Sequence, residues 1–341
     1  MLGYGNSDKK LPSHEHHQGH GGHIHTHGVV DPSIFTTQRG IWAVKWSFFG
    51  LMITAIIQII IVMLTGSVAL LADTIHNFGD ALTAIPLWIA FMLARQKPGK
   101  RFTYGYGRVE DLAGVLIVLI ILLSAIVAAY QSIDRFFHMK TVTYLWAVVA
   151  ASMVGFIGNE AVAQFRIKVG KEIGSAALVV DGQHARADGL TSLAVFPGAV
   201  GIYLGFPLAD PIIGLFISVA IFRIVWQSGK SIFTRLLDGV DSEVIEEITH
   251  AANHIQGVCD ITEVRVRWLG HRLHAELNIA VSPELSVVKG HEIALEVRHR
   301  LLHHLKYLSN VTIHVDPVDM SGETHHRIPE HTHDDFPSHS H

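Results

Sequence analysis

Cysteine is almost absent from this sequence, which contains only Cys259. A single thiol excludes any disulfide bond within the chain and gives no sign of an oxidising compartment. Charged side chains are also scarce, at 16% of residues against about 25% in soluble domains. The net charge of −4 offers no basic surface for nucleic acid. With 49% hydrophobic residues, this composition indicates a protein whose main solvent is lipid.

Histidine is the residue type in excess, with 25 copies against 26 for Lys and Arg together. Many of these histidines alternate with small and polar residues in the two end segments, 1–40 and 319–341. Such segments cannot bury a core, and we expect both to be disordered tails. The tails could capture metal loosely or be unselective polar extensions, and the sequence leaves both readings open. Residues 1–40 are too polar for a secretory signal.

Six apolar stretches of membrane-spanning length lie between Ile41 and Trp226. They predict an all-α six-helix transmembrane domain over residues 41–235, with lipid as its partner. Basic residues, Arg101 and Arg166 among them, gather after the second and fourth stretches. This bias places those loops and both termini in the cytoplasm, with the plasma or inner membrane as the expected location. The stretches run over about 41–65, 69–94, 112–137, 144–166, 175–204 and 210–228.

Residues 238–318 have the character of a soluble domain. Amphipathic helices are predicted over Ser242–His254 and Val287–His304. Strands are predicted over Asp260–Leu269, Arg272–Val281 and Val311–Val315, with a turn at Gly270 between the first two. The order αββαβ in about 80 residues predicts a small cytoplasmic two-layer α/β sandwich.

The second and fifth apolar stretches both carry the pattern D-x-x-H-x-x-x-D-x-L-T. On a helix, residues three or four apart share one face, so each stretch presents a stripe of carboxylate, imidazole and carboxylate. Ionised groups at membrane depth are costly, and they mark ion pathways or sites. A single H-x-x-x-D pair could be an interhelical hydrogen bond, but two matching copies favour a metal site. The residues are Asp73, His76 and Asp80 in the second stretch and Asp181, His184 and Asp188 in the fifth.

Two facing H-x-x-x-D pairs would supply two imidazole nitrogens and two carboxylate oxygens. This tetrahedral N/O set, His76, Asp80, His184 and Asp188, suits Zn²⁺. Mg²⁺ and Ca²⁺ prefer oxygen ligands alone, and Cu⁺ prefers sulfur ligands, which are absent from the stripes. We expect Asp73 and Asp181, one turn outward, to line an entrance or to support the ligands rather than to bind the ion.

Taken together, these features resemble the cation diffusion facilitator family. The resemblance rests on six spans, the paired H-x-x-x-D motif, the segment Tyr-Gly-Tyr-Gly-Arg-Val-Glu at 104–110 and the terminal αββαβ domain, and it covers about residues 40–318. It implies a homodimeric exporter, not an enzyme, that exchanges cytoplasmic metal for protons. A histidine at position 76 is typical of the zinc-transporting members. A second metal site found in some members after the second span is expected to be absent here, because the segment Phe102–Tyr106 has no histidine.

The resemblance also implies metal binding in the cytoplasmic domain, with Zn²⁺ as a regulator as well as the transported substrate. His314 and Asp316, two apart on one strand, would share a face. For His291 a plain surface position remains an alternative, as does a small buried apolar position for Cys259. The candidate ligands are His291, His314, Asp316, Glu276, Cys259 and His274.

The mechanism we expect is alternating access, in which protons compete with Zn²⁺ for the same groups. Rival readings are a metal-selective channel without proton coupling, a membrane metallohydrolase, a metal sensor, and a broader transporter that also carries Cd²⁺, Co²⁺, Ni²⁺ or Mn²⁺. Arg108 and Asp238 are predicted to form a charged latch between the membrane and soluble parts.

Overall fold

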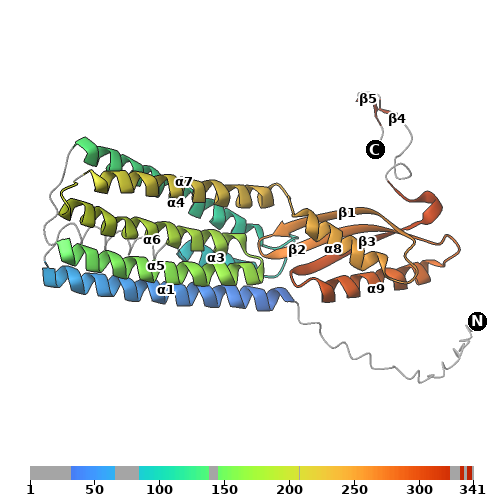
Figure 1. Cartoon of the computed structure of the whole chain (residues 1–341). Helices are drawn as coiled ribbons and strands as arrows, with labels where there is room; N and C mark the ends of the chain where they lie inside the picture. Colours follow the sequence, from blue (N-terminus) through green and yellow to red (C-terminus); the bar gives the residue numbers. More distant parts are fainter. Residues whose placement is uncertain are drawn as a thin grey trace, which may run out of the picture. The chain divides into compact units, whose positions relative to one another are not determined.

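The computed structural model describes residues 32–65, 84–137, 145–206, 208–322, 331–333 and 336–339. Figure 1 shows long helices gathered into a bundle and, after them in the chain, a small sheet with two helices. The bundle helices are α1 (Pro32–Thr65), α3 (Ala84–Ala94), α4 (Arg108–Phe137), α5 (Leu145–Ile173), α6 (Ala176–Tyr203) and α7 (Ala209–Leu236). The remaining elements are α8 (Ser242–Asn253), β1 (Asp260–Leu269), β2 (Arg272–Val281), α9 (Val287–His304), β3 (Leu308–Pro317), η1 (Val318–Met320), β4 (His331–His333) and β5 (Phe336–His339).

The first helix begins at Pro32, inside the segment that the sequence predicts as a disordered tail. Proline is favoured at the first position of a helix, because its fixed φ suits the helix and its missing N–H would have no partner there. The 34 residues of α1 span about 51 Å at 1.5 Å each, more than the roughly 30 Å hydrocarbon core of a bilayer. The helix is therefore longer than the hydrocarbon core is thick, and the tail prediction is wrong for residues 32–40.

The C-terminal tail also contains ordered backbone where no element is predicted. Strand β4 pairs antiparallel with β5, with His331 opposite His339 and His333 opposite Phe336. The histidine-rich part of the N-terminal tail lies outside the described residues.

Close packing of α5 against α1 and α6 depends on small residues. A Cβ on Gly158 would lie 2.2 Å from the hydroxyl oxygen of Thr54 on α1. A Cβ on Gly155 would lie 2.8 Å from the side-chain nitrogen of Gln58. Small residues on one face allow helix backbones to approach in a membrane, where packing drives association.

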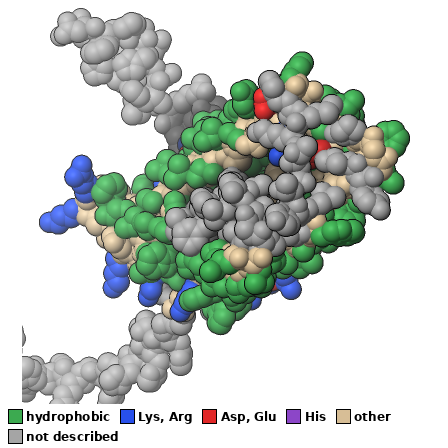
Figure 2. Space-filling view, turned by 90° about the vertical axis from the view of Figure 1, so that its left-hand side faces the viewer, with side chains coloured by type: hydrophobic (Ala, Val, Ile, Leu, Met, Phe, Trp, Pro, Cys, Tyr) green, Lys and Arg blue, Asp and Glu red, His purple; other side chains and the backbone are tan. Residues whose placement is uncertain are grey.

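Three described helices are long and apolar enough to span a membrane, over Thr36–Ile61, Arg108–Phe137 and Ala209–Leu236. Large apolar side chains project outward from them, including Ile53, Leu123 and Phe216. Hydrophobic side chains cover much of the coloured surface at the end of the bundle seen in Figure 2. This is the surface that lipid requires, because acyl chains solvate apolar side chains but no bare polar group.

Helix α5 continues seven residues past the predicted end of its span, and this changes the environment of Arg166. The sequence pattern places Arg166 at the start of a basic cytoplasmic loop. In the structure it lies inside α5 with only 1% of its surface exposed. The loop prediction is wrong for this residue, because its guanidinium is held by partners on other helices.

The cytoplasmic domain is the two-layer αββαβ sandwich that the sequence predicts. Strand β2 is central, antiparallel to β1 and parallel to β3. Helix α9 makes the crossover between the two parallel strands, as such a pairing requires. Alternate residues of β2, such as Leu273 and Leu277, are buried under α8 and α9 with Val297 and Leu301. The other face of β2 therefore lies away from both helices.

The turn between β1 and β2 packs against the beginnings of α1 and α4. Gly270, at a φ of +64°, forms the turn as predicted, because glycine enters the left-handed region without steric cost. A Cβ on Gly107 would lie 2.5 Å from the Leu269 carbonyl oxygen, so only glycine fits there. Arg108 contacts Asp238 as an ion pair, so the predicted contact is present, and its role as a latch stays a prediction.

Candidate metal-transport site

Half of the predicted transport site lies on α6. His184 and Asp188 are one turn apart on this helix and are 1% and 4% exposed. His184 Nδ1 lies 3.5 Å from Asp188 Oδ2. The structure therefore places an imidazole and a carboxylate side by side within the bundle, at the spacing the motif predicts.

The predicted ligands of the other half, His76 and Asp80, lie outside the described residues, and so does Asp73. Within the described ranges, no three His, Cys, Asp or Glu side chains gather closely enough to hold a metal ion. The four-ligand site thus remains a prediction. Of its four residues, the structure describes His184 and Asp188 on α6.

Asp181 lies one turn before His184 and is fully buried. Its Oδ2 is 3.0 Å from Nη1 of Arg166 on α5. The Nε of Arg166 in turn donates to the hydroxyl of Ser47 on α1, at 2.9 Å. Asp181 is thus engaged by a cation, which agrees with a supporting role better than with binding the ion.

Polar side chains continue along α5 and α6 beside this pair. Asn159 is buried, and a Cβ on Gly189 would lie 3.3 Å from its Cβ. Arg186 donates two hydrogen bonds to Glu160, at 2.8 and 3.1 Å. Bidentate pairing of this kind fixes both side chains and links the two helices. Ion pairs therefore join α5 to α6 in addition to the apolar contacts between these two helices.

In the cytoplasmic domain, the structure brings together two of the predicted ligands. His314 Nε2 lies 2.8 Å from Asp316 Oδ1 on β3. The His314 side chain is 57% exposed and that of Asp316 is 6% exposed. Both belong to the sheet face turned away from the helices, since the alternate residues Ile313 and Val315 pack in the core. This pair could supply two ligands to a metal that takes its others from elsewhere.

The remaining cytoplasmic candidates are spread apart. Glu276 is on the same sheet face, but its carboxylate accepts a hydrogen bond from Arg267 at 2.9 Å. His274 lies two residues earlier on β2, and Cys259 is exposed where β1 begins. His291 is exposed on α9, in the helical layer. On the same helix, a hydrogen bond to Glu292 raises the pKa of the Lys289 ammonium.

Two buried polar contacts were not found by sequence reasoning. One is the pair formed by Arg166 and Asp181, and the other joins Glu110 of α4 to His271 of the β1–β2 turn at 2.6 Å. Glu110 is part of the 104–110 motif, which was the only local signal. The partners are 161 residues apart in the second pair, so no periodic pattern could connect them.

Comparison with known proteins gives the family. The model of the cation efflux transmembrane domain matches residues 44–237, and that of the cation efflux protein cytoplasmic domain matches residues 240–318. A probable cation efflux system protein of Mycobacterium tuberculosis is 49% identical over 298 residues, covering 86% of this chain and 90% of that protein. The manganese efflux system protein MneS of Bacillus subtilis is 23% identical over 279 residues, covering 80% and 94%.

Magnetosome protein MamB of a Magnetospira species is 25% identical over 278 residues, covering 81% of this chain and 95% of that protein. Among solved structures, a MamM CTD in a manganese form is 26% identical and covers 22% of this chain and 96% of that one, with a TM-score of 0.22. Both domain matches follow one another in this chain, in the order of its bundle and its sandwich. This chain therefore belongs to the cation diffusion facilitator family, a family of membrane transporters for the efflux of divalent metal ions.

Proposed function

We propose that this chain exports Zn²⁺ from the cytoplasm in exchange for protons, through a site built from His76, Asp80, His184 and Asp188. The observation that carries the proposal is the buried pair of His184 and Asp188 on α6. The same residue pattern recurs at His76 and Asp80. Such costly groups inside an apolar bundle are best explained by a shared cation.

The choice of Zn²⁺ follows from the donor atoms. Two imidazoles and two carboxylates can surround an ion tetrahedrally, which Zn²⁺ accepts without strain. The relative named for manganese efflux makes Mn²⁺ the first competitor to test. Cd²⁺, Co²⁺ and Ni²⁺ are further competitors, because they share nitrogen and oxygen ligands with zinc.

Proton exchange follows from the same ligands. An imidazole binds metal only when it is neutral, so a metal and a proton compete for it. Free imidazole titrates at a pKa of about 6.5, within reach of ordinary gradients. Metal would load from the cytoplasmic side and leave when protons arrive from the other side.

Topology and assembly complete the proposal. We place the transport domain at 41–235 with six spans, both termini in the cytoplasm, and the regulatory domain at 238–318. The chain would work as a homodimer in which a second copy completes a zinc site begun by His314 and Asp316. Zinc there would draw two cytoplasmic domains together and report the cytoplasmic concentration of the ion.

The decisive experiment measures metal uptake into proteoliposomes driven by a pH gradient, with zinc and proton fluxes recorded together. Asp188→Ala should abolish zinc uptake, because a carboxylate ligand is lost. Ser132→Ala, which alters a buried polar residue of α4, should leave uptake near the wild-type rate. Normal transport by the Asp188 variant would refute the site, and zinc flux without proton flux would indicate a channel instead.

A further inference from the structure

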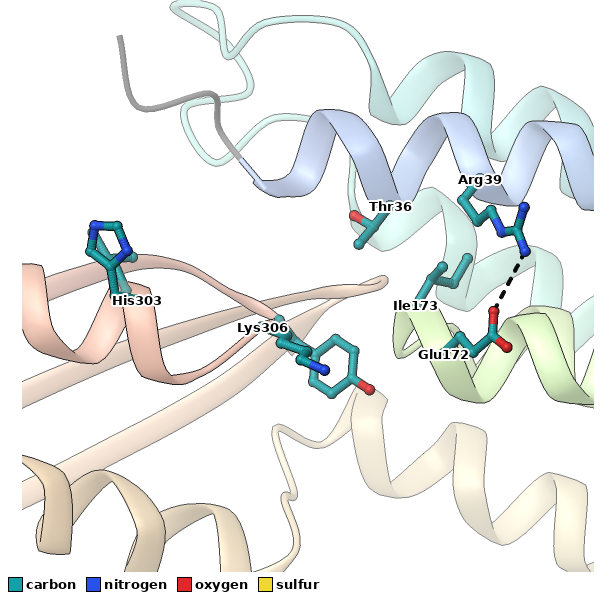
Figure 3. Close-up of a pocket in the computed structure, with 8 residues that line it drawn as sticks. Thr36, Arg39, Glu172, Ile173, His303 and Lys306 are labelled. Carbon is teal, nitrogen blue, oxygen red and sulfur yellow. Dashed lines mark ion pairs between the residues drawn. The ribbon is translucent and has the colours of Figure 1, made fainter. Parts of the chain in front are cut away.

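A cavity of about 420 Å³ lies where the bundle meets the cytoplasmic domain. Figure 3 shows Thr36 and Arg39 on α1, Glu172 on α5, and His303 and Lys306 from the end of α9 and the residue stretch after it, arranged around this space. The cavity is walled by both domains. Its polar groups lie outside the proposed transport site, and the proposed function gives them no role.

Cations outnumber anions among the side chains that line the cavity. Among the described residues that line the cavity, Arg39 and Lys306 each carry a positive charge, and Glu172 supplies the one carboxylate. The Nη2 of Arg39 is 3.8 Å from Glu172 Oε2, and the two side chains are 40% and 44% exposed. A long, solvent-exposed pair of this kind is weak. The Arg39 guanidinium is therefore available to a better anion.

Neighbouring residues are of the kinds expected at the level of the lipid headgroups. The apolar part of α1 begins at Thr36, which lines the cavity. The Arg39 guanidinium lies over the ring of Trp42, 4.3 Å from its centroid. Trp42 and Trp46 are 40% and 57% exposed on the outside of the bundle. Exposed tryptophans of this kind concentrate at the boundary between membrane and water.

Further basic side chains stand at the same end of the bundle. Lys168 and Lys171 are exposed on the last turns of α5. Clusters of Lys and Arg beside a membrane helix attract anionic headgroups, because the cytoplasmic leaflet carries negative charge. The attraction would act on lipids already held in the plane of the membrane.

We propose that this cavity binds the headgroup phosphate of an anionic phospholipid from the cytoplasmic leaflet. Arg39 and Lys306 contact the phosphate from the membrane side and the cytoplasmic side. Arg39 exchanges its weak contact with Glu172 for a charge-assisted one. The acyl chains lie along the outside of α1, past Trp42 and Trp46. Because one phosphate then binds cations from both domains, the lipid fastens the cytoplasmic domain to the bundle.

The test is native mass spectrometry of the full-length protein, released from nanodiscs that contain phosphatidylglycerol and phosphatidylcholine. Wild-type protein should retain phosphatidylglycerol selectively. The double variant Arg39→Gln, Lys306→Gln should retain at least about tenfold less. A matched control, Lys289→Gln with Arg300→Gln, removes two exposed cations of α9 outside the cavity and should retain the wild-type amount.

A variant expected to increase lipid retention is also needed, because a misfolded protein could only lose retention. Glu172→Gln removes the competing carboxylate and should increase retention of phosphatidylglycerol. Equal retention by wild type and the Arg39, Lys306 double variant would overturn the proposal, and so would reduced retention in Glu172→Gln. Displacement of the lipid by excess inorganic phosphate would also overturn it, because the cavity would then be a site for soluble anions.

Discussion

His271 Nδ1 lies 2.6 Å from Glu110 Oε2, with both side chains about 1% exposed. The other ring nitrogen, Nε2, lies 2.8 Å from the hydroxyl of Thr37 on α1. Glu110 also accepts hydrogen bonds from the His271 backbone N–H and from the hydroxyl of Ser175, just before α6. The turn between β1 and β2 is thus bound to α1, α4 and the start of α6. A movement of these helices must carry the cytoplasmic domain along or break this contact.

Replacing this histidine should destabilise the protein strongly. His271→Ala leaves the Glu110 carboxylate buried without its main partner, and removal of one member of a buried pair costs about 3–5 kcal/mol of unfolding free energy. Thermal unfolding in detergent should show a clear loss of Tm, and zinc transport should slow because the two domains become uncoupled.

The matched control is His299→Ala, which removes an exposed imidazole from α9. It should change the unfolding free energy by no more than about 0.5 kcal/mol, as surface substitutions usually do. If His271→Ala were as stable as this control, Glu110 would not depend on the imidazole, and the coupling of the domains would need another explanation.

Arg166 and Asp181 should behave as a coupled pair. Arg166→Gln leaves a buried carboxylate unpaired next to His184, and Asp181→Asn leaves a buried guanidinium unpaired. Each single variant should be less stable than wild type, and the double variant should recover part of the loss. A double-mutant cycle on unfolding midpoints should give a coupling energy of about 1–3 kcal/mol.

Lys168→Gln provides the control for that cycle, since Lys168 is exposed on the same helix. Additive effects of Arg166→Gln and Asp181→Asn would mean that the 3.0 Å contact contributes nothing. In that case Asp181 would be free to act at the metal entrance.

The local pattern of apolar and polar residues was enough to predict the helices and strands of the cytoplasmic domain. The predicted strands Asp260–Leu269 and Arg272–Val281 coincide with β1 and β2, because period-two alternation and a glycine turn define a hairpin. The helix over Val287–His304 is confirmed for the same kind of reason, since its apolar residues recur at helical spacing. The third strand is longer than predicted, over Leu308–Pro317, because its ends pair with β2 in spite of polar residues such as Asn310.

Contacts between segments far apart in the sequence could not be predicted from local hydropathy or composition. Hydropathy ends the fourth span at Arg166, whereas the helix continues, and Asp181 and Ser47 bind the guanidinium inside the bundle. Likewise, Pro32 begins α1 in a stretch whose composition favours a disordered tail. The first outcome depends on partners brought close by folding, and the second on the preference of proline for the first position of a helix.

The ligand at position 76 should set metal preference. His76→Asp replaces an imidazole nitrogen with a carboxylate oxygen, which favours harder ions. We expect the ratio of zinc to manganese uptake in proteoliposomes to fall on the order of tenfold, equivalent to about 1.4 kcal/mol. Uptake of zinc should also depend less on external pH, since one fewer imidazole must be neutral. An unchanged ratio together with an unchanged pH profile would count against His76 as a ligand.

His314 and Asp316 should affect regulation and leave the transport site intact. The double variant His314→Ala, Asp316→Ala removes the 2.8 Å contact between these two predicted cytoplasmic ligands. If zinc at this pair draws two copies together, the variant should need more cytoplasmic zinc to reach half-maximal rate and should keep the same maximal rate. His250→Ala, an exposed histidine on α8, should not change either value. The measurement is initial zinc flux against zinc concentration on the cytoplasmic face, with dimer content recorded by mass photometry. A variant that dimerises and responds to zinc like wild type would show that these two side chains only bind each other.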